Sequence, residues 1–187
     1  MARIKIVSQE EATGRLKAVY DELIEKRGQL AEVHMIQSLR PESIMKHIDL
    51  YMEIMYTRSK LSRAQREMIA VIVSAANQCE YCQMHHGQAL NHYWKNWDRV
   101  DQLRKAFRSM EDLNEKERAL CEYAEVMTLY PGSAKETDHT LPLKQLGFDD
   151  SAILDATLVI AYFNFVNRIV MGLDVELEVD AGSGYKY

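Results

Sequence analysis

The stretch that decides the fold is residues 66–86, which read REMIAVIVSAANQCEYCQMHH. Ser62 and Gln65 stand just before it and form a capping-box pattern, which is typical of a helix start. The apolar run continues this helix, and Asn77 is expected to end it in the left-handed conformation. Cys79 then opens the next helix. The segment therefore predicts two consecutive helices joined by a tight turn.

This hairpin would bring Glu67 level with His86. Glu67 lies about ten residues before the turn at Asn77, or roughly 15 Å along a helix that rises about 1.5 Å per residue. His86 lies about nine residues beyond the turn, or roughly 13 Å back along an antiparallel neighbour. Packed helices lie about 8–10 Å apart, so the two side chains can meet directly or through one water. An acid among apolar neighbours needs such a partner.

Two cysteines and a histidine share the inward face of the second helix. Cys82 and His86 are four residues apart, and Cys79 lies one turn before Cys82. We expect the helix N-terminus and His86 to lower the pKa of Cys82, because both favour the reactive thiolate. With Glu67 orienting the imidazole, the thiolate would attack a peroxide O–O bond and become a sulfenic acid. The thiol of Cys79 would convert it to a disulfide, which an external dithiol would reduce.

Zinc binding is the main alternative for the Cys-x-x-Cys pair. Cys79, Cys82 and His86 could supply three ligands, but a structural zinc site takes four and the sequence contains no second knuckle. Glu67 is a less typical fourth ligand. We therefore expect neither a metal nor another cofactor. Cys121 stands alone in a predicted helix and is interpreted as a small buried hydrophobic residue.

Helical periodicity covers most of the chain, and no run alternates convincingly with period two. We predict an all-α, single-domain multi-helix bundle over residues 1–187, with the Cys-x-x-Cys motif at the start of a core helix. Within it, residues 1–58 form the N-terminal helices and residues 61–94 form the motif hairpin. Residues 175–187 are expected to form a mobile tail.

A long apolar helix is predicted from Ile153 to about Gly172, after a shorter one around residues 133–146. A helix that is apolar nearly all round is usually buried on most sides. The long helix is therefore either the central helix of the core or part of a subunit interface. Asn164 and Asn167 interrupt it, and we favour a structural role for both because buried amides need partners.

Composition excludes several classes of function. The 187 residues carry a net charge of −5 and contain no basic run, which argues against nucleic-acid binding. The N-terminus lacks the apolar stretch of a signal peptide. Asp155 and Arg168 argue against a membrane span in the apolar helix. Three cysteines without an export signal do not describe a disulfide framework. We expect a cytoplasmic protein.

The pattern Glu67-x11-Cys79-x2-Cys82-x3-His86 resembles the core motif of the peroxidase branch of the alkylhydroperoxidase D and carboxymuconolactone decarboxylase superfamily. The later stretch YFNFVNRIVMGLDVELE is similar to the peroxidase-related subgroup, and the resemblance covers about residues 10–175. It implies an all-α fold, homo-oligomers and the motif in a two-helix hairpin at the core. It also implies that Cys82 meets the peroxide, that Cys79 resolves the product, and that Glu67 and His86 relay the proton.

One position departs from the well-studied branch, which has a second histidine just before the second cysteine, where this chain has Tyr81. A phenol donates a hydrogen bond but is a weak base at neutral pH, so we expect a shorter relay with Tyr81 as an auxiliary residue. His85 is placed on a solvated or interface face of the helix. His34 and His47 have no motif context, and no role is assigned to either.

The sequence thus predicts a thiol-dependent peroxidase that reduces a small hydroperoxide and draws electrons from an external dithiol. Two alternatives stay open: a dithiol–disulfide oxidoreductase without peroxidase turnover, and a redox-sensing oligomer. A decarboxylase is less favoured because that branch does not depend on this cysteine pair. Neither a nucleic acid nor a membrane is expected as a partner.

Overall fold

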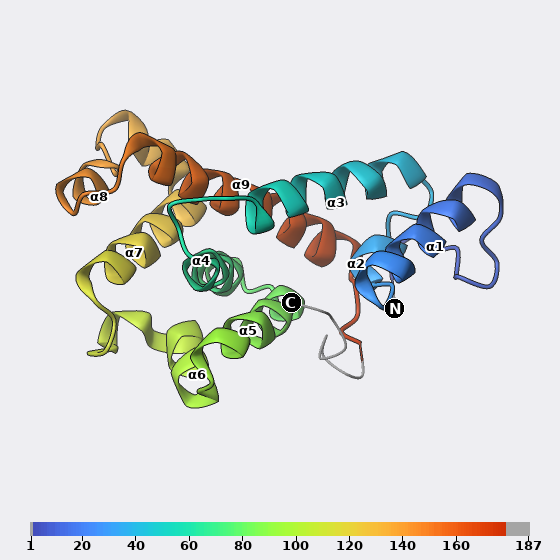
Figure 1. Ribbon diagram of the computed structural model, residues 1–187, viewed down its shortest axis with the longest axis horizontal. Coiled ribbons are helices and arrows are strands. Elements are labelled where there is room, and N and C mark those ends of the chain that lie inside the picture. The colour runs from blue at the N-terminus through green and yellow to red at the C-terminus, as the bar shows by residue number, and fades with distance from the viewer. Residues whose placement is uncertain (1, 179–187) are drawn as a thin grey trace.

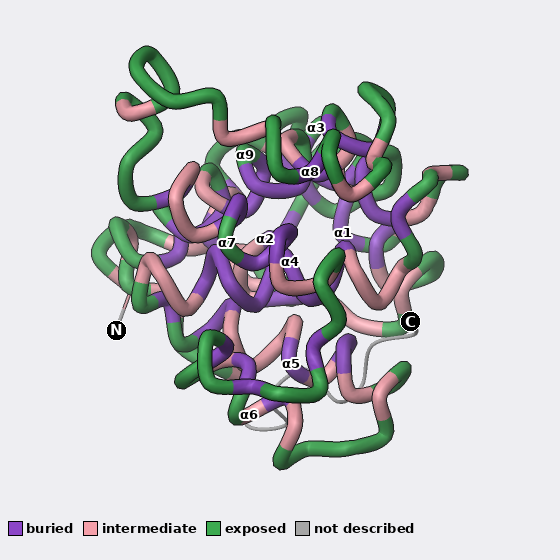
Figure 2. Tube along the Cα trace, turned by 90° about the vertical axis from the view of Figure 1, so that its left-hand side faces the viewer, coloured by how far each residue is buried: buried purple, intermediate pink, exposed green. Residues whose placement is uncertain are grey.

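The helices pack around one central helix, α4 (Arg63–Ala76), in the computed structural model (Figure 1). α3 (Pro41–Tyr56) and α9 (Asp150–Leu173) lie on one side of α4, and α5 (Glu80–Trp94) lies on the other. Every residue from Arg66 to Ser74 is buried, so α4 contacts neighbours all round (Figure 2). The side chains of residues 66–74 are therefore shielded from bulk water.

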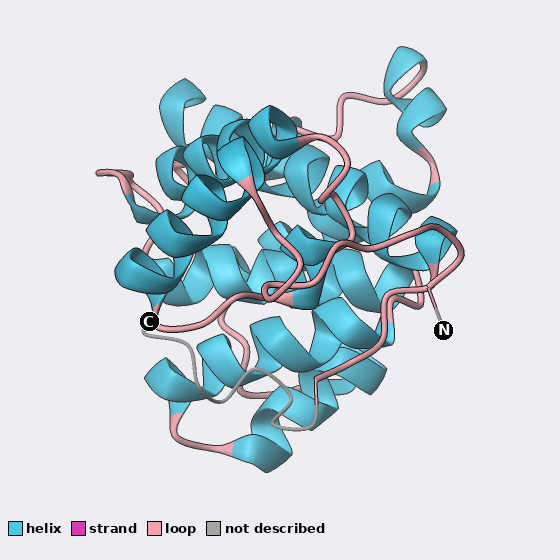
Figure 3. Ribbon diagram, turned by 90° about the vertical axis from the view of Figure 1, so that its right-hand side faces the viewer, coloured by secondary structure: helices cyan, strands magenta, loops and turns pink. Residues whose placement is uncertain are grey.

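The structure describes residues 2–178, and every regular element in this range is a helix (Figure 3). The predicted all-α class and the position of the Cys-x-x-Cys motif at the start of a core helix are therefore confirmed. The remaining elements are α1 (Gly14–Arg27), α2 (Glu32–Met35), α6 (Trp97–Ala106), η1 (Phe107–Ser109), α7 (Glu115–Leu129), η2 (Pro131–Lys135) and α8 (Leu141–Gln145).

The predicted start of α4 and its end at Asn77 are confirmed, but the predicted left-handed conformation of Asn77 is wrong. The Ser62 hydroxyl accepts from the Gln65 amide, and the Gln65 side chain accepts from the Ser62 amide, which completes the capping box. Asn77 keeps a right-handed conformation, with φ −80°, and Gln78 takes the left-handed one, with φ 59°. The side chain of Asn77 is committed to other contacts, which explains the shift.

Asn77 ties the end of α4 to α9 through a buried amide network. Its Nδ2 donates to Asn164 Oδ1 at 3.0 Å and to Asn167 Oδ1 at 2.9 Å. Asn167 is fully buried, and its Nδ2 donates to Ser74 Oγ at 3.3 Å. The structural role favoured for Asn164 and Asn167 is confirmed.

Arg66 joins α4 to the end of α3. This arginine is buried, and its Nη1 donates to the carbonyl oxygens of Ile54 at 3.0 Å and Thr57 at 3.2 Å. Carbonyls in the last turn of a helix have no partner within the helix, so the guanidinium satisfies them. The position of α3 over the motif hairpin is thereby fixed.

The predicted helix around residues 133–146 is wrong as a single element. The chain forms η2 and α8 there, with a turn between them. In that turn, the Asp138 carboxylate accepts from the Thr140 amide at 2.9 Å and from its hydroxyl. Short polar side chains that bond the backbone in this way compete with helix formation.

α9 is buried on one side only. Val159, Phe163 and Val166 lie in the core, whereas Leu154 and Leu158 are exposed. Among residues 2–178, α9 is the one helix whose length and composition would suffice to cross a membrane, but core helices of soluble proteins meet the same criteria. Its contacts with α3, α4 and α7 are those of a core helix.

We predict that Asn167→Leu lowers the free energy of unfolding by about 1–3 kcal/mol, because Asn77 and Ser74 each lose a buried partner. Urea denaturation followed by circular dichroism would measure the change. Gln102→Leu, at an exposed position of α6, is the control and should change stability by less than about 0.5 kcal/mol. Equal stabilities of the Asn167 variant and the wild type would contradict a structural role for the network.

Candidate active site

Cys79 and Cys82 lie where α4 gives way to α5. Cys79 is the N-cap residue of α5, and its backbone amide donates to the carbonyl oxygen of Ser74 at 2.9 Å. Both thiols are buried and free. The turn between the helices is short, so the first turn of α5 lies directly beside the end of α4.

Glu67 and His86 meet directly across the two helices. Glu67 Oε2 lies 2.7 Å from His86 Nδ1, and the Glu67 side chain has no exposed area. The contact predicted from the helix rise is confirmed. Because an ionised carboxylate only accepts, the hydrogen bond assigns the ring proton to Nδ1 and leaves Nε2 as the basic nitrogen.

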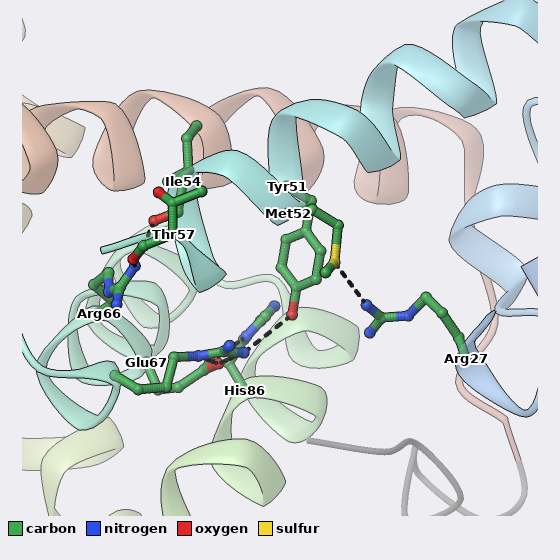
Figure 4. A network of polar contacts seen from close by, with 9 residues as sticks. Arg27, Tyr51, Met52, Ile54, Thr57, Arg66, Glu67 and His86 are labelled. Atoms are coloured by element: carbon green, nitrogen blue, oxygen red, sulfur yellow. Dashed lines mark hydrogen bonds and ion pairs between the residues drawn. The ribbon is translucent and has the colours of Figure 1, made fainter. Parts of the chain in front are cut away.

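Arg63 holds the other oxygen of Glu67 and was missed from the sequence. Its Nε and Nη2 donate to Glu67 Oε1 at 2.8 and 2.5 Å, and its Nη2 approaches the Tyr51 hydroxyl at 3.5 Å. Figure 4 shows the Glu67 side chain beside His86, with the hydroxyl of Tyr51 pointing toward them. Burial opposes ionisation, but His86 and Arg63 together lower the pKa of Glu67 below its ordinary value. The spacing of four residues between Arg63 and Glu67 was a signal available in the sequence.

The expected lowering of the Cys82 pKa is wrong. Of the two cysteines, Cys79 has the lowered pKa and Cys82 the raised one. Hydrogen bonding from Cys82 outweighs burial and lowers the pKa of Cys79 below its ordinary value. The hydrogen bond to Cys79, together with burial, raises the pKa of Cys82 well above its ordinary value. Cys79 occupies the N-cap, so it receives the stabilisation that the sequence assigned to Cys82.

A pocket of about 80 Å³ opens beside Cys82. Cys82 and His86 line it, and Cys79 does not. The other walls are mainly aromatic and aliphatic, and they come from α1, α2, α3, α5 and α9 and from the segment that joins α1 to α2; they include Tyr51, Tyr81, Tyr162, Phe163 and Val166. A small molecule in this pocket would therefore contact Cys82 and not Cys79.

His34 and His47 also line the pocket, although the sequence assigned neither a role. Their rings lie edge to face at 5.5 Å, and Gln37 Nε2 lies 2.7 Å from His47 Nδ1. Burial lowers the pKa of His47 to about 4, and burial together with His47 lowers that of His34. Both imidazoles are therefore neutral at pH 7 and add polar groups without charge.

His85 faces the same pocket, so its predicted place on a solvated or interface face is wrong. Its Nε2 lies 2.7 Å from Glu178 Oε2, and its ring stacks on Tyr81 at 4.3 Å. The Tyr81 hydroxyl donates to Glu178 Oε1 at 2.7 Å. On a helix, the residues three and four positions after Cys82 both share its face. The prediction placed only His86 on that face.

Glu178 belongs to the segment predicted to be a mobile tail. Residues 175–178 are described and dock beside α2, where Glu178 Oε1 accepts from the Glu32 amide at 2.9 Å. The rest of that predicted tail, residues 179–187, lies outside the described residues. Nothing in the sequence linked Glu178 to the motif, because 97 positions separate it from Tyr81.

Metal binding has no further support from the geometry. Within residues 2–178, no three or more His, Cys, Asp or Glu side chains are grouped so that they could hold a metal ion. Cys121 is fully buried in α7, and burial raises the pKa of its thiol, which fits its interpretation as a small buried hydrophobic residue.

Comparison with known proteins places the motif in a family. Residues 43–104, which contain all four motif residues, match the carboxymuconolactone decarboxylase family. The segment that carries the motif is therefore similar to this family. The resemblance inferred from the motif is therefore confirmed. No curated protein matches the chain by sequence.

Several solved structures share the fold of this chain over nearly its whole length. An alkylhydroperoxidase AhpD core protein, an uncharacterized peroxidase-related protein from Ralstonia eutropha JMP134, aligns with a TM-score of 0.85 at 23% identity over 97% of this chain and 94% of its own. An uncharacterized peroxidase-related protein from Silicibacter sp. TM1040 gives a TM-score of 0.81 at 25% identity, over 96% and 90%. The debrominase Bmp8 gives 0.78 at 20% identity, over 97% and 95%.

The stability of the folded chain should depend on pH through Glu178. Burial disfavours its charge, but the hydrogen bond and charge of His85 outweigh burial and lower the pKa of Glu178 to about 2. An unfolded glutamate titrates near pH 4.3, so the folded state gains stability that is complete above that pH and is lost as the pH falls toward 2. We predict that Glu178→Gln removes on the order of 2 kcal/mol of stability at pH 6 and flattens the acid limb.

Urea denaturation between pH 3 and pH 7 would measure this limb. Glu111→Gln, at an exposed position, is the matched control and should leave the curve unchanged. An acid limb of wild-type steepness in the Glu178 variant would contradict the assignment.

Proposed function

We propose that the protein is a thiol-dependent oxidoreductase that reduces a small hydroperoxide at Cys82. The observation that carries the proposal is that Cys82 and His86 line one pocket, while Cys79 lies behind Cys82 within hydrogen-bond reach. That arrangement matches an attacking thiol, its base and a resolving thiol. The names of two fold relatives, which include "peroxidase-related", agree with it.

The reaction would proceed in three balanced steps. Cys82 gives its proton to His86 Nε2, and the sulfur attacks the terminal peroxide oxygen; the S–O bond forms, the O–O bond breaks, and an alcohol leaves once its oxygen is protonated. Cys79 then attacks the sulfenic acid, which releases water and forms the Cys79–Cys82 disulfide. An external dithiol reduces this disulfide by exchange and is itself oxidised.

The Glu67 carboxylate acts on this reaction through His86. It fixes the tautomer in which Nε2 accepts a proton, and it stabilises the imidazolium that forms. Arg63 keeps the carboxylate ionised and oriented. Glu67 and Arg63 are therefore positioning residues, and Cys82, Cys79 and His86 carry the chemistry.

Reductive dehalogenation is a second candidate. The pocket walls that Tyr51, Tyr162 and Phe163 contribute would suit a flat ring. A variant of the debrominase Bmp8 bound to 2,3,4-tribromopyrrole gives a TM-score of 0.79 with this chain. The same dithiol could reduce an aryl bromide to the arene and hydrogen bromide while forming the disulfide. A bromide-release assay with a brominated pyrrole would test this candidate.

We predict that hydroperoxide consumption with a dithiol reductant is abolished by Cys82→Ser. Cys79→Ser should instead stop after one turnover and accumulate a sulfenic acid at Cys82, because no thiol remains to resolve it. Peroxide assays and mass spectrometry after trapping with dimedone would measure the two effects.

Cys121→Ala is the control, since this thiol lies away from the pocket, and it should retain turnover. Absence of turnover in the wild type, with a disulfide still forming on oxidation, would reject the peroxidase and leave a disulfide exchanger or a redox sensor. Equal activity of the Cys82 variant and the wild type would reject the site itself.

We also propose that the chain forms a homo-oligomer and works in the cytoplasm, where thiols are kept reduced. Leu154, Leu158 and Phe165 form an exposed apolar stripe on α9, and Leu50 is exposed on neighbouring α3. Contiguous exposed apolar residues of this kind mark contact surfaces. A second copy of the chain is the occupant that the superfamily resemblance favours.

We predict that Leu154→Glu combined with Leu158→Glu shifts the protein to a smaller species, because both charges would be buried in the proposed interface. Size-exclusion chromatography with light scattering would measure the mass. Glu111→Lys, at an exposed site outside the stripe, should leave the mass unchanged. A monomeric wild type would contradict the proposal.

A further inference from the structure

Two imidazole–carboxylate pairs flank Cys82. His86 pairs with Glu67, and His85 pairs with Glu178, in each case at 2.7 Å. An α-helix turns about 100° per residue, so a side chain three positions on lies about 60° to one side of Cys82 and one four positions on about 40° to the other. The pocket beside Cys82 therefore has a histidine on each side.

The His85–Glu178 pair, like the His86–Glu67 pair, is held in place by hydrogen bonds to the other carboxylate oxygen. Glu178 Oε1 accepts from the Glu32 amide at 2.9 Å and from the Tyr81 hydroxyl at 2.7 Å, while Oε2 faces His85. The stacked ring of Tyr81 fixes the plane of the imidazole. The side chains of His85 and Glu178 are 12% and 17% exposed, which is enough shielding to strengthen the pairing.

The two pairs differ in charge. Arg63 already neutralises Glu67, so His86 faces a carboxylate whose charge is compensated. The donors that the described residues give Glu178, apart from His85, are a backbone amide and a phenol, which are neutral. His85 therefore faces a carboxylate whose charge these donors leave uncompensated, whereas His86 faces one that Arg63 neutralises.

We propose that His85, positioned by Glu178 and Tyr81, is the general acid that protonates the oxygen leaving from the peroxide. The inference rests on the proposed peroxidase function. It supplies the proton donor that the reaction needs on the side of Cys82 opposite the base. It also gives Tyr81 a role, which is to hold the acid in place.

The proton balance closes over one turnover. The Cys82 proton passes to His86 as the sulfur attacks, and the departing alkoxide takes a proton from His85, so an alcohol and a Cys82 sulfenic acid form. His86 is then protonated and His85 is neutral. Transfer of one proton between them through water in the pocket restores the starting state.

The test compares oxidants whose leaving groups differ in basicity. tert-Butyl hydroperoxide releases a strongly basic alkoxide, whereas peracetic acid releases acetate, which needs no proton at neutral pH. Single-turnover oxidation of Cys82 by each oxidant would be measured, together with its alkylation by iodoacetamide, which reports the base alone. We expect His85→Gln to slow the hydroperoxide reaction by about 10²-fold or more and the other two by less than about threefold.

Further variants separate the acid from the base. Glu178→Gln should show the same selective loss to a smaller degree, because it keeps hydrogen-bonding capacity but removes the charge. Glu67→Gln should slow all three reactions, because it impairs the base at His86. His92→Gln, at an exposed position of α5, is the matched control and should change none of them.

Equal slowing of both oxidants in His85→Gln would mean that His85 only supports the structure, and wild-type rates would mean that it has no part; either overturns the inference. The wild type is measured first, so that failure of the proposed function can be told apart from failure of this inference. If it is alkylated at Cys82 but oxidised by neither oxidant, the proposed function is rejected and this inference with it. If His85→Gln does not fold, the ratio of oxidant rates in Glu178→Gln decides.

Discussion

The Glu67 carboxylate, shared between His86 and Arg63, is the interaction on which the rest of the structure depends. An ionised carboxylate on a helix that is buried all round is costly unless each of its oxygens finds a donor. One oxygen is satisfied from α5 and the other from the previous turn of α4. The register of the two motif helices is therefore set by a charge as well as by apolar packing. Displacement of either helix by one turn would separate Glu67 from His86 and leave Oε2 without its donor.

In the proposed reaction, this constraint determines how Cys82 is activated. In the resting pair Cys82 is the donor and Cys79 the acceptor, so the thiol that faces the pocket keeps its proton. Buried, protonated thiols react slowly with general oxidants, because the thiolate is the nucleophile. Activation of Cys82 must come from removal of its proton by a base within the pocket. His86 meets that condition because Glu67 leaves Nε2 unprotonated.

Sequence reasoning succeeded where the geometry is local. The start of α4 and the contact between Glu67 and His86 follow from caps and helix rise, because a short turn joins the two helices. It failed where distant segments dock. His34 reaches the pocket, and Glu178 reaches His85, only after the segments that follow α1 and α9 pack against α5, and no periodicity encodes this. Asn77 was misassigned for the same reason, since its amide serves α9.

α9 connects the pocket with the outer surface. Phe163 packs edge to face on His86 at 4.3 Å, and Val166 lines the pocket, while Leu158 and Phe165 point outward from the same turns. Glu178 lies five residues after the end of this helix at Leu173. A rigid helix cannot move one face without the other. The exposed stripe of α9 and the contact of Phe163 with His86 are therefore carried by one rigid element.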